Sequence, residues 1–202
     1  MASKRSYTVP VLLLIITGLA ILLMLIYSKL LFTQQKEYTD AGKRLAERYN
    51  YALIFADRLG TGADLLLKDG SVADRLKAKK LLGEASMAGG ETVGILAEAS
   101  SRSTGQSFEE AFKPVSEAMT RIMSEQAGNV YGVSEHEGAL TAEEKELLTA
   151  VRDGASKMKE QLLVFRPPTV DSGYRTMNAG GEWIAQAVAA GQTLIDTAAK
   201  VK

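Results

Sequence analysis

The side chains best suited to bind a metal or move a proton surround the only histidine of the chain. His136 stands between Glu135 and Glu137, so three groups that can ligate a metal occur in succession. A closed zinc site needs four ligands, and this spacing differs from the HExxH pattern that places two histidines on one helix face. We therefore interpret the segment as an acidic loop without a metal. Since histidine titrates near pH 6.5, His136 is also a candidate pH sensor.

Nucleophilic chemistry has one formal match in the sequence. Ser156 and Lys159 have the S-x-x-K spacing of serine acylases, but the companion motifs S-D-N and K-T-G are missing, and the pair falls inside a predicted helix. The acidic pairs Glu109-Glu110 and Glu143-Glu144 lie in first turns of predicted helices, where carboxylates stabilise the positive end of the helix dipole. The chain contains no cysteine, which excludes thiol catalysis, disulfides and cysteine-ligated zinc. We expect no enzyme and no cofactor.

An uncharged apolar run near the N-terminus is the strongest signal in the sequence. Val9–Tyr27 holds no charge, and a helix over this run spans about 28 Å, close to the roughly 30 Å of bilayer hydrocarbon. The apolar character continues to Phe32, so residues 9–32 are predicted to form a transmembrane anchor. The alternatives are a cleaved signal peptide or a buried core helix. The run is longer than the roughly 7–15 apolar residues of a signal peptide, and no Ala-x-Ala site follows it.

The orientation of the anchor follows from the positive charges beside it. Lys4 and Arg5 precede the run, and five cations follow it within about twenty residues, namely Lys29, Lys36, Lys43, Arg44 and Arg48. The count alone favours a cytoplasmic C-terminal side, but long domains translocate largely regardless of charge. We therefore predict that residues 1–8 form a short cytoplasmic tail and that residues 33–202 form an extracytoplasmic domain.

The composition of residues 33–202 limits the classes of partner. All 24 acidic residues lie in this segment, whereas three of the 24 basic residues (Lys4, Arg5 and Lys29) precede it, which leaves a net charge of −3. Nucleic-acid binding needs a basic surface, so we exclude it. The length suits one domain with its own core.

Helical periodicity continues after the anchor. From Tyr38 to Leu59 apolar residues recur at steps of three and four, as on one face of an amphipathic helix. No proline or glycine lies between Leu19 and Ala41, so the membrane helix is predicted to run on into this helix and to end at Asp69-Gly70. A second helix should begin with Ser71 as N-cap. Gly89-Gly90 predicts either a break in it or a closely packed neighbour.

Three further helices are predicted from their starting signals. Ser107 with Glu110 is a capping box that opens a helix to about Ala127, in which Pro114 predicts a kink or a late start. Thr141 with Glu144 opens a helix to about Phe165, and Asp171 or Ser172 should cap a last helix that runs nearly to the end. Alternating strand patterns are absent. The prediction is an all-α fold, with a transmembrane helix followed by an up-and-down bundle of four to five helices.

Two groups of residues are candidates for contact with other molecules. The alanine-rich last helix either packs closely in the core or presents a surface to a partner or ligand, in which case the contact residues are Tyr174, Trp183, Ala187 and Ala190. The densest basic segment is either an ordinary solvated helix face or a contact with anionic lipid headgroups or wall polymer. Its cations are Arg75, Lys77, Lys79 and Lys80.

Two functions fit these features. The first is a non-enzymatic interaction or regulatory module for another membrane or envelope protein. The second is a ligand-sensing bundle, because the layout is similar to the extracytoplasmic four-helix sensory domains of bacterial receptors. Those receptors usually return through a second membrane helix, and this sequence reaches Lys202 without one, so a sensor here should need a partner subunit. The predicted partners are the lipid bilayer and a membrane or envelope protein, and self-association stays open.

Overall fold

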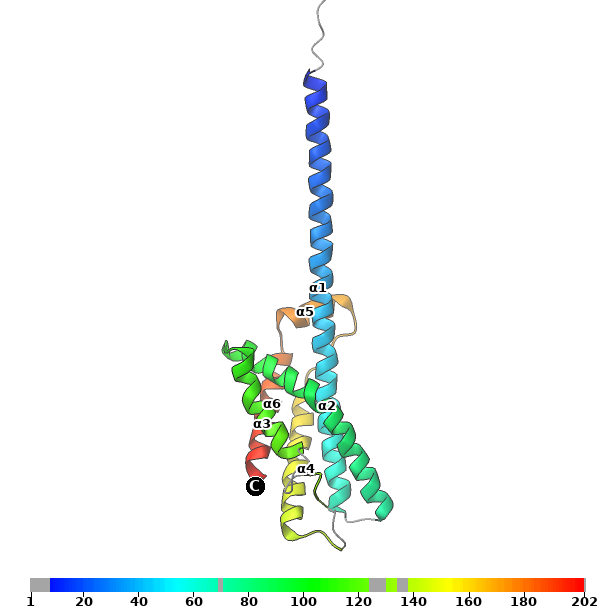
Figure 1. Ribbon diagram of the computed structural model, residues 1–202, viewed down its shortest axis with the longest axis vertical. Helices are drawn as coiled ribbons and strands as arrows, with labels where there is room; N and C mark the ends of the chain where they lie inside the picture. The colour runs from blue at the N-terminus through cyan, green and yellow to red at the C-terminus, as the bar shows by residue number, and fades with distance from the viewer. Residues whose placement is uncertain (1–7, 69–70, 124–129, 134–137, 202) are drawn as a thin grey trace, which may run out of the picture.

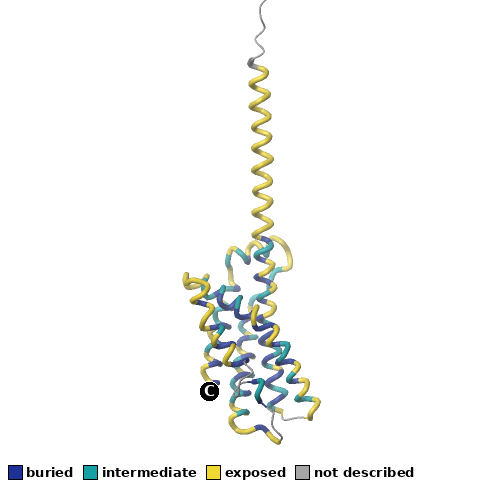
Figure 2. The backbone as a smooth tube through the Cα atoms, in the orientation of Figure 1, coloured by how far each residue is buried: buried dark blue, intermediate teal, exposed yellow. Residues whose placement is uncertain are grey.

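One long helix joins the apolar run to the rest of the molecule (Figure 1). The computed structural model describes residues 8–68, 71–123, 130–133 and 138–201, which form six helices and no strand. Helix α1 covers Thr8–Leu67 without interruption, which confirms the predicted continuity. Its side chains are exposed from Val11 to Phe32, and the first buried one is Thr39 (Figure 2).

Helix α2 covers Val72–Thr104 and begins where the sequence predicts. The Ser71 side chain accepts a hydrogen bond from the Asp74 backbone, and the Asp74 carboxylate accepts one from Ser71 N, so this cap is confirmed. The helix runs unbroken through Gly89-Gly90. Gly89 is buried beside Met119 of the next helix, which agrees with the alternative of a closely packed neighbour. Gly105, in the left-handed conformation at φ 76°, ends the helix.

Helix α3 covers Phe108–Met123 and starts directly after its capping box. Ser107 N and Oγ both donate to the Glu110 carboxylate, at 3.0 and 2.8 Å, and these bonds lower the pKa of Glu110. The predicted late start is therefore wrong, because the cap fixes the first turn before Pro114 is reached. Pro114 lies within the helix on its exposed side. The predicted end near Ala127 falls outside the described residues.

The C-terminal part holds three helices where the sequence predicted two. Helix α4 covers Ala142–Leu163 and has the predicted Thr141–Glu144 capping box. The single last helix is wrong: α5 covers Asp171–Ala179 and α6 covers Trp183–Lys200. Gly180 and Gly181 have φ values of 135° and 121°, which a helix does not tolerate. The predicted cap of α5 is also wrong, since the N-cap position is Val170 and carries no side-chain cap.

The helices pack as an up-and-down bundle, as predicted. The C-terminal half of α1 contacts α2 and α4, and α6 contacts the same two helices from the opposite side, so each neighbour in this ring is antiparallel (Figure 1). Helix α3 packs on α2 and α6, and α5 packs on α1. Figure 1 places α5 at the end of the bundle from which the free half of α1 emerges, and places the C-terminal end of α1 and the N-terminal ends of α2 and α4 at the opposite end.

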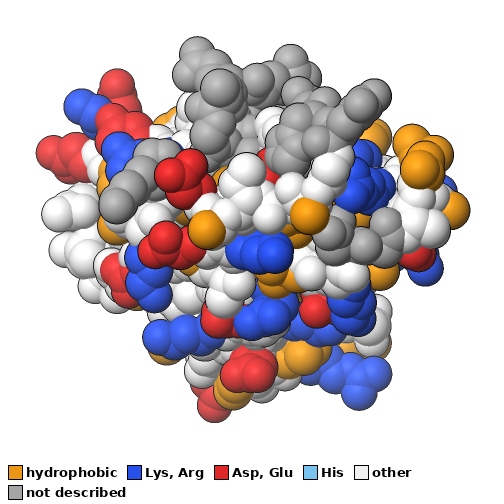
Figure 3. All heavy atoms as spheres, turned by 90° about the horizontal axis from the view of Figure 1, so that it is seen from below, with side chains coloured by type: hydrophobic (Ala, Val, Ile, Leu, Met, Phe, Trp, Pro, Cys, Tyr) orange, Lys and Arg blue, Asp and Glu red, His pale blue; other side chains and the backbone are white. Residues whose placement is uncertain are grey.

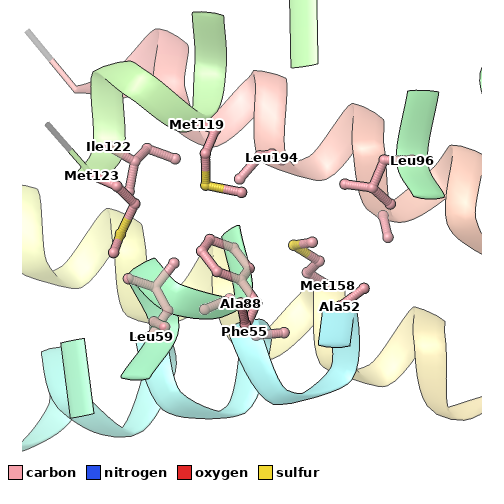
Figure 4. Close-up of a cluster of buried hydrophobic side chains, with 14 of the residues drawn as sticks. Ala52, Phe55, Leu59, Ala88, Leu96, Met119, Ile122, Met123, Met158 and Leu194 are labelled. Atoms are coloured by element: carbon pink, nitrogen blue, oxygen red, sulfur yellow. The ribbon is translucent and has the colours of Figure 1, made fainter. Parts of the chain in front are cut away.

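The core is apolar, and five of the helices meet in the part of it that Figure 4 shows. Buried side chains from every bundle helix except α5 meet in the cluster drawn there, namely Ala52, Phe55 and Leu59 of α1, Ala88 and Leu96 of α2, Met119, Ile122 and Met123 of α3, Met158 of α4 and Leu194 of α6. A methionine-rich cluster of this kind fills irregular gaps between helices, because the unbranched side chain adapts its shape. The free half of α1 takes no part in this core.

Two glycines let neighbouring elements approach closely. A Cβ atom built on Gly42 of α1 would lie 1.9 Å from the backbone oxygen of Tyr174 in α5. A Cβ atom on Gly154 of α4 would lie 2.1 Å from Thr197 Oγ1 in α6. Any larger residue at either position must displace the opposing helix, so these two contacts hold α5 on α1 and α6 on α4 at short range.

Candidate functional site

The structure places most of the predicted partner-contact residues inside the bundle. Trp183, Ala187 and Ala190 are fully buried on α6, and Tyr174 on α5 is half-buried. These three positions agree with the interpretation that the alanine-rich helix packs in the core. A partner could reach these three side chains only if α6 left the bundle. Their role in binding stays a prediction.

Trp183 connects three helices instead of lining a surface. Its Nε1 donates to the Met177 backbone oxygen at 2.9 Å, and the Arg102 guanidinium of α2 lies 5.6 Å from the centre of its ring. Arg102 also donates to the Asn178 backbone oxygen at 2.7 Å. The indole thus fixes the Gly180-Gly181 turn between α5 and α6 against the end of α2.

Tyr49 is a second buried polar anchor. Its hydroxyl donates to the Leu162 backbone oxygen at 2.8 Å, and its ring meets Phe165 edge-on with 5.3 Å between centres. Burial raises the pKa of Tyr49 well above its ordinary value near 10. The bond joins α1 to the end of α4 and leaves the hydroxyl no evident catalytic task.

The predicted basic segment lies at the end of the bundle opposite the apolar run. At 1.5 Å per residue, α1 extends about 50 Å from Phe32 to Leu67, and α2 starts next to that end. Two of the four cations hold the α3–α4 connection, since Arg75 donates to the Gly138 oxygen and Lys79 to the Tyr131 oxygen. Lys77 and Lys80 are exposed. Figure 3, which views this end, shows Lys and Arg side chains interspersed with Asp and Glu.

This position separates the two partners proposed for the basic segment. Headgroups of a membrane that holds residues 9–32 would lie about 40–50 Å away, beyond the reach of any side chain in the segment. A wall polymer or a second membrane could still meet Lys77 and Lys80. Contact with lipid headgroups by these residues stays a prediction, and it requires a surface other than the one that holds α1.

The lysine of the S-x-x-K match is paired with an acidic residue of another helix. Lys159 forms an ion pair with Asp57 of α1 at 2.7 Å, and Ser156 is exposed on α4. His136 lies outside the described residues. Within the described part of the chain no group of three or more His, Asp or Glu residues could hold a metal ion.

A shallow groove between α2 and α3 is the site that sequence reasoning missed. Its volume is about 220 Å³, and it is lined by small and polar residues of α2 and by a mixed face of α3. The lining residues are Ser86, Gly89, Gly90, Val93, Phe112, Ser116, Met119, Thr120 and Met123. The one signal that pointed here was the glycine pair in α2.

Phe112 lines this groove, and two further exposed apolar side chains lie on the same two helices. Met87 is 86% exposed on α2, and Phe108 and Phe112 of α3 are 44% and 37% exposed. The two phenylalanine rings lie 5.7 Å apart. Gly90 is exposed, and a Cβ atom added to it would meet nothing within 4 Å. Together these residues, which we call the α2–α3 face, expose apolar surface beside a groove that has room for an inserted side chain.

Comparisons with protein-family models, with curated proteins and with solved structures found no match to this chain. One helix of the described chain is long and apolar enough to cross a membrane, and the apolar window within it is 0% buried. In the structure residues 10–32 therefore lie outside the core of the bundle.

Proposed function

We propose that the chain is a single-pass membrane protein whose helical bundle acts as an interaction or regulatory module for another membrane or envelope protein. In this proposal residues 1–8 are cytoplasmic, residues 9–32 span the membrane and the bundle is extracytoplasmic. The observation that carries the proposal is the uninterrupted helix α1, which passes from an exposed apolar run directly into the core of the bundle. A bundle joined in this way stays at a fixed distance from the membrane.

The α2–α3 face is the surface we assign to the partner. Phe108, Phe112 and Met87 are the side-chain types that are enriched where proteins meet, and the groove beside them offers a pocket for an anchoring residue. No catalytic step is part of this proposal.

Photocrosslinking in native membranes tests the partner assignment. Benzoylphenylalanine replaces Phe112 in one variant and the exposed Tyr51 of α1 in the matched control. We expect one reproducible membrane or envelope protein to be joined through position 112 and not through position 51. Equal labelling at both positions, or only the chain itself recovered, would count against the adaptor.

Topology and anchoring need separate measurements. Because the chain contains no cysteine, a single Met87→Cys substitution gives one labelling site on the bundle. A maleimide that cannot cross membranes should label this cysteine in intact cells if the bundle is extracytoplasmic. The mass of the mature chain distinguishes an anchor from a cleaved signal peptide, since cleavage would remove the first part of α1.

The ligand-sensing alternative has a narrower basis. The groove contains the hydroxyl groups of Ser86, Ser116 and Thr120 beside apolar residues, a mixture that small-molecule sites share. Its volume of about 220 Å³ is below the roughly 300–1,000 Å³ typical of such sites. A Gly90→Leu variant would occupy the open space, so a small molecule that stabilises the native chain in a thermal-shift screen should no longer stabilise this variant.

A further inference from the structure

The end of the bundle nearest the apolar run has a shape and position that suit a lipid surface. Helix α5 and the residue before it form this end (Figure 1). The exposed residues here are Val170, Asp171, Ser172, Arg175, Thr176 and Ala179, which we call the α5 cap. We propose that the α5 cap contacts the phospholipid headgroup layer through Arg175 and thereby fixes the direction in which α1 tilts. This inference relies on the proposed membrane anchor.

The height of the α5 cap above the membrane follows from α1. The Arg175 Nη1 atom donates to Thr39 Oγ1 at 3.2 Å, and Thr39 is seven residues beyond Phe32, or about 10 Å along the helix axis. The headgroup layer on each side of a bilayer is about 5–7 Å deep. An upright α1 would therefore leave the Arg175 guanidinium just outside this layer. The α5 backbone, which packs on Gly42 about 15 Å beyond Phe32, would lie further out.

A modest tilt brings the α5 cap into contact. The apolar residues 9–32 span about 36 Å as a helix, longer than the roughly 30 Å of hydrocarbon, and an excess of this kind is relieved by tilting. A tilt of about 30° matches the two lengths. An element packed about 10 Å from the α1 axis then moves about 5 Å toward the bilayer on the leaning side. The Arg175 guanidinium would thus lie about 4 Å beyond the hydrocarbon, among the headgroups. The α5 backbone at Tyr174 would lie about 8 Å beyond it, at the outer edge of the headgroup layer.

The close packing of α5 on α1 makes this contact directional. The Tyr174 backbone lies against Gly42, and Lys43 forms an ion pair with Asp171 at 3.6 Å. Because α5 is held on one side of α1 by these contacts, lowering the α5 cap toward the bilayer means leaning α1 toward that side. The opposite lean would lift α5 out of reach.

The chemistry of the α5 cap suits a phospholipid and not an apolar partner alone. Val170 is 61% exposed and offers one apolar side chain. The Arg175 guanidinium has five N–H donors, so it can bind a phosphate oxygen while it keeps its bond to Thr39. The charged residues near the α5 cap nearly balance one another, namely Lys36, Lys43, Glu37, Asp40 and Asp171. The contact therefore needs the phosphate group that all phospholipids share. It does not need an excess of anionic lipid.

Fluorescence quenching in vesicles tests the contact. The full-length chain is reconstituted in phosphatidylcholine vesicles that contain a fraction of lipid with a nitroxide on its headgroup. Val170→Cys carries an environment-sensitive fluorophore in one variant, and Val72→Cys carries it in the matched control. Val72 is also a valine, is 75% exposed and lies at the opposite end of the bundle, at the start of α2. The cysteine-free chain ensures one label in each variant.

The expected result is quenching several-fold stronger at position 170 than at position 72, and weaker quenching at 170 when Arg175→Glu is added. Equal quenching at the two positions would overturn the proposal. A third variant, Leu22→Cys with a nitroxide on the acyl chain, reports the anchor itself. Quenching at 22 without quenching at 170 refutes the headgroup contact alone, and no quenching at 22 refutes the anchor and the contact together. Emission of the buried Trp183 verifies that each variant is folded.

Discussion

The contact between Gly154 and Thr197 should control the stability of the bundle. In Gly154→Ala the new Cβ atom would lie 2.1 Å from Thr197 Oγ1 and 2.8 Å from its Cγ2. Crowding of this kind in a packed interior costs about 1–3 kcal/mol of unfolding free energy. Alanine returns up to about 1 kcal/mol through its higher helix propensity.

The control variant Gly90→Ala separates the cost of crowding from the gain in helix propensity. Gly90 also lies inside a helix, but its added Cβ atom meets nothing within 4 Å, so this variant gains the propensity without the clash. Because the propensity gain is common to both variants, Gly154→Ala should be less stable than Gly90→Ala by about 1–3 kcal/mol. Each kcal/mol shifts Tm by about 2–4 °C in a chain of this size.

Thermal unfolding of the full-length chain in detergent, followed by far-UV circular dichroism, measures this difference. Thr197→Ala removes the two closest atoms, so Gly154→Ala combined with Thr197→Ala should recover most of the loss caused by crowding. At Gly42 the opposing atoms belong to the Tyr174 backbone, so no substitution at 174 should rescue Gly42→Ala. If Gly154→Ala proved as stable as Gly90→Ala, the reasoning from the α4–α6 approach would be refuted.

Three other outcomes are expected. Tyr49→Phe removes the bond to Leu162 and should cost about 0.5–1.5 kcal/mol in urea unfolding, whereas the exposed Tyr51→Phe should cost little. Because burial raises the pKa of Tyr49, the native chain should keep its full stability below about pH 10 and lose stability as the pH rises further. Its stability advantage over Tyr49→Phe should shrink over the same range above pH 10. Trp183→Ala should cost about 3–5 kcal/mol, against less than about 0.5 for the exposed Met87→Ala; equal losses would contradict the assigned burial.

The starts of α2, α3 and α4 were predictable because their signals are local. Ser71, Ser107 and Thr141 each exchange hydrogen bonds with a residue three positions later, so a short stretch of sequence contains both partners. The break within the predicted last helix was not predictable in the same way. Gly180-Gly181 lowers helix propensity in any context, but only the packing of Trp183 against Met177 and Arg102 decides that the chain turns there.

The contact surfaces were the least predictable feature. An alanine-rich helix face is equally compatible with a core and with a docking surface, because small side chains permit close approach in both. The structure buries Ala187 and Ala190 and instead exposes Phe108 and Phe112, which read in the sequence as ordinary members of an amphipathic helix. Nothing within one helix states which neighbours will cover it.

The sequence by itself determined the all-α class, the apolar run to Phe32 and its continuation into the bundle. Each depends on side-chain periodicity and on hydrogen bonds between residues three or four apart. Only the tertiary structure decided that the basic segment lies about 40–50 Å from the apolar run, that α5 packs on α1 at Gly42, and that α2 and α3 leave a groove open. The reason is physical: these features depend on atoms that are distant in the sequence, and packing alone sets where such atoms meet.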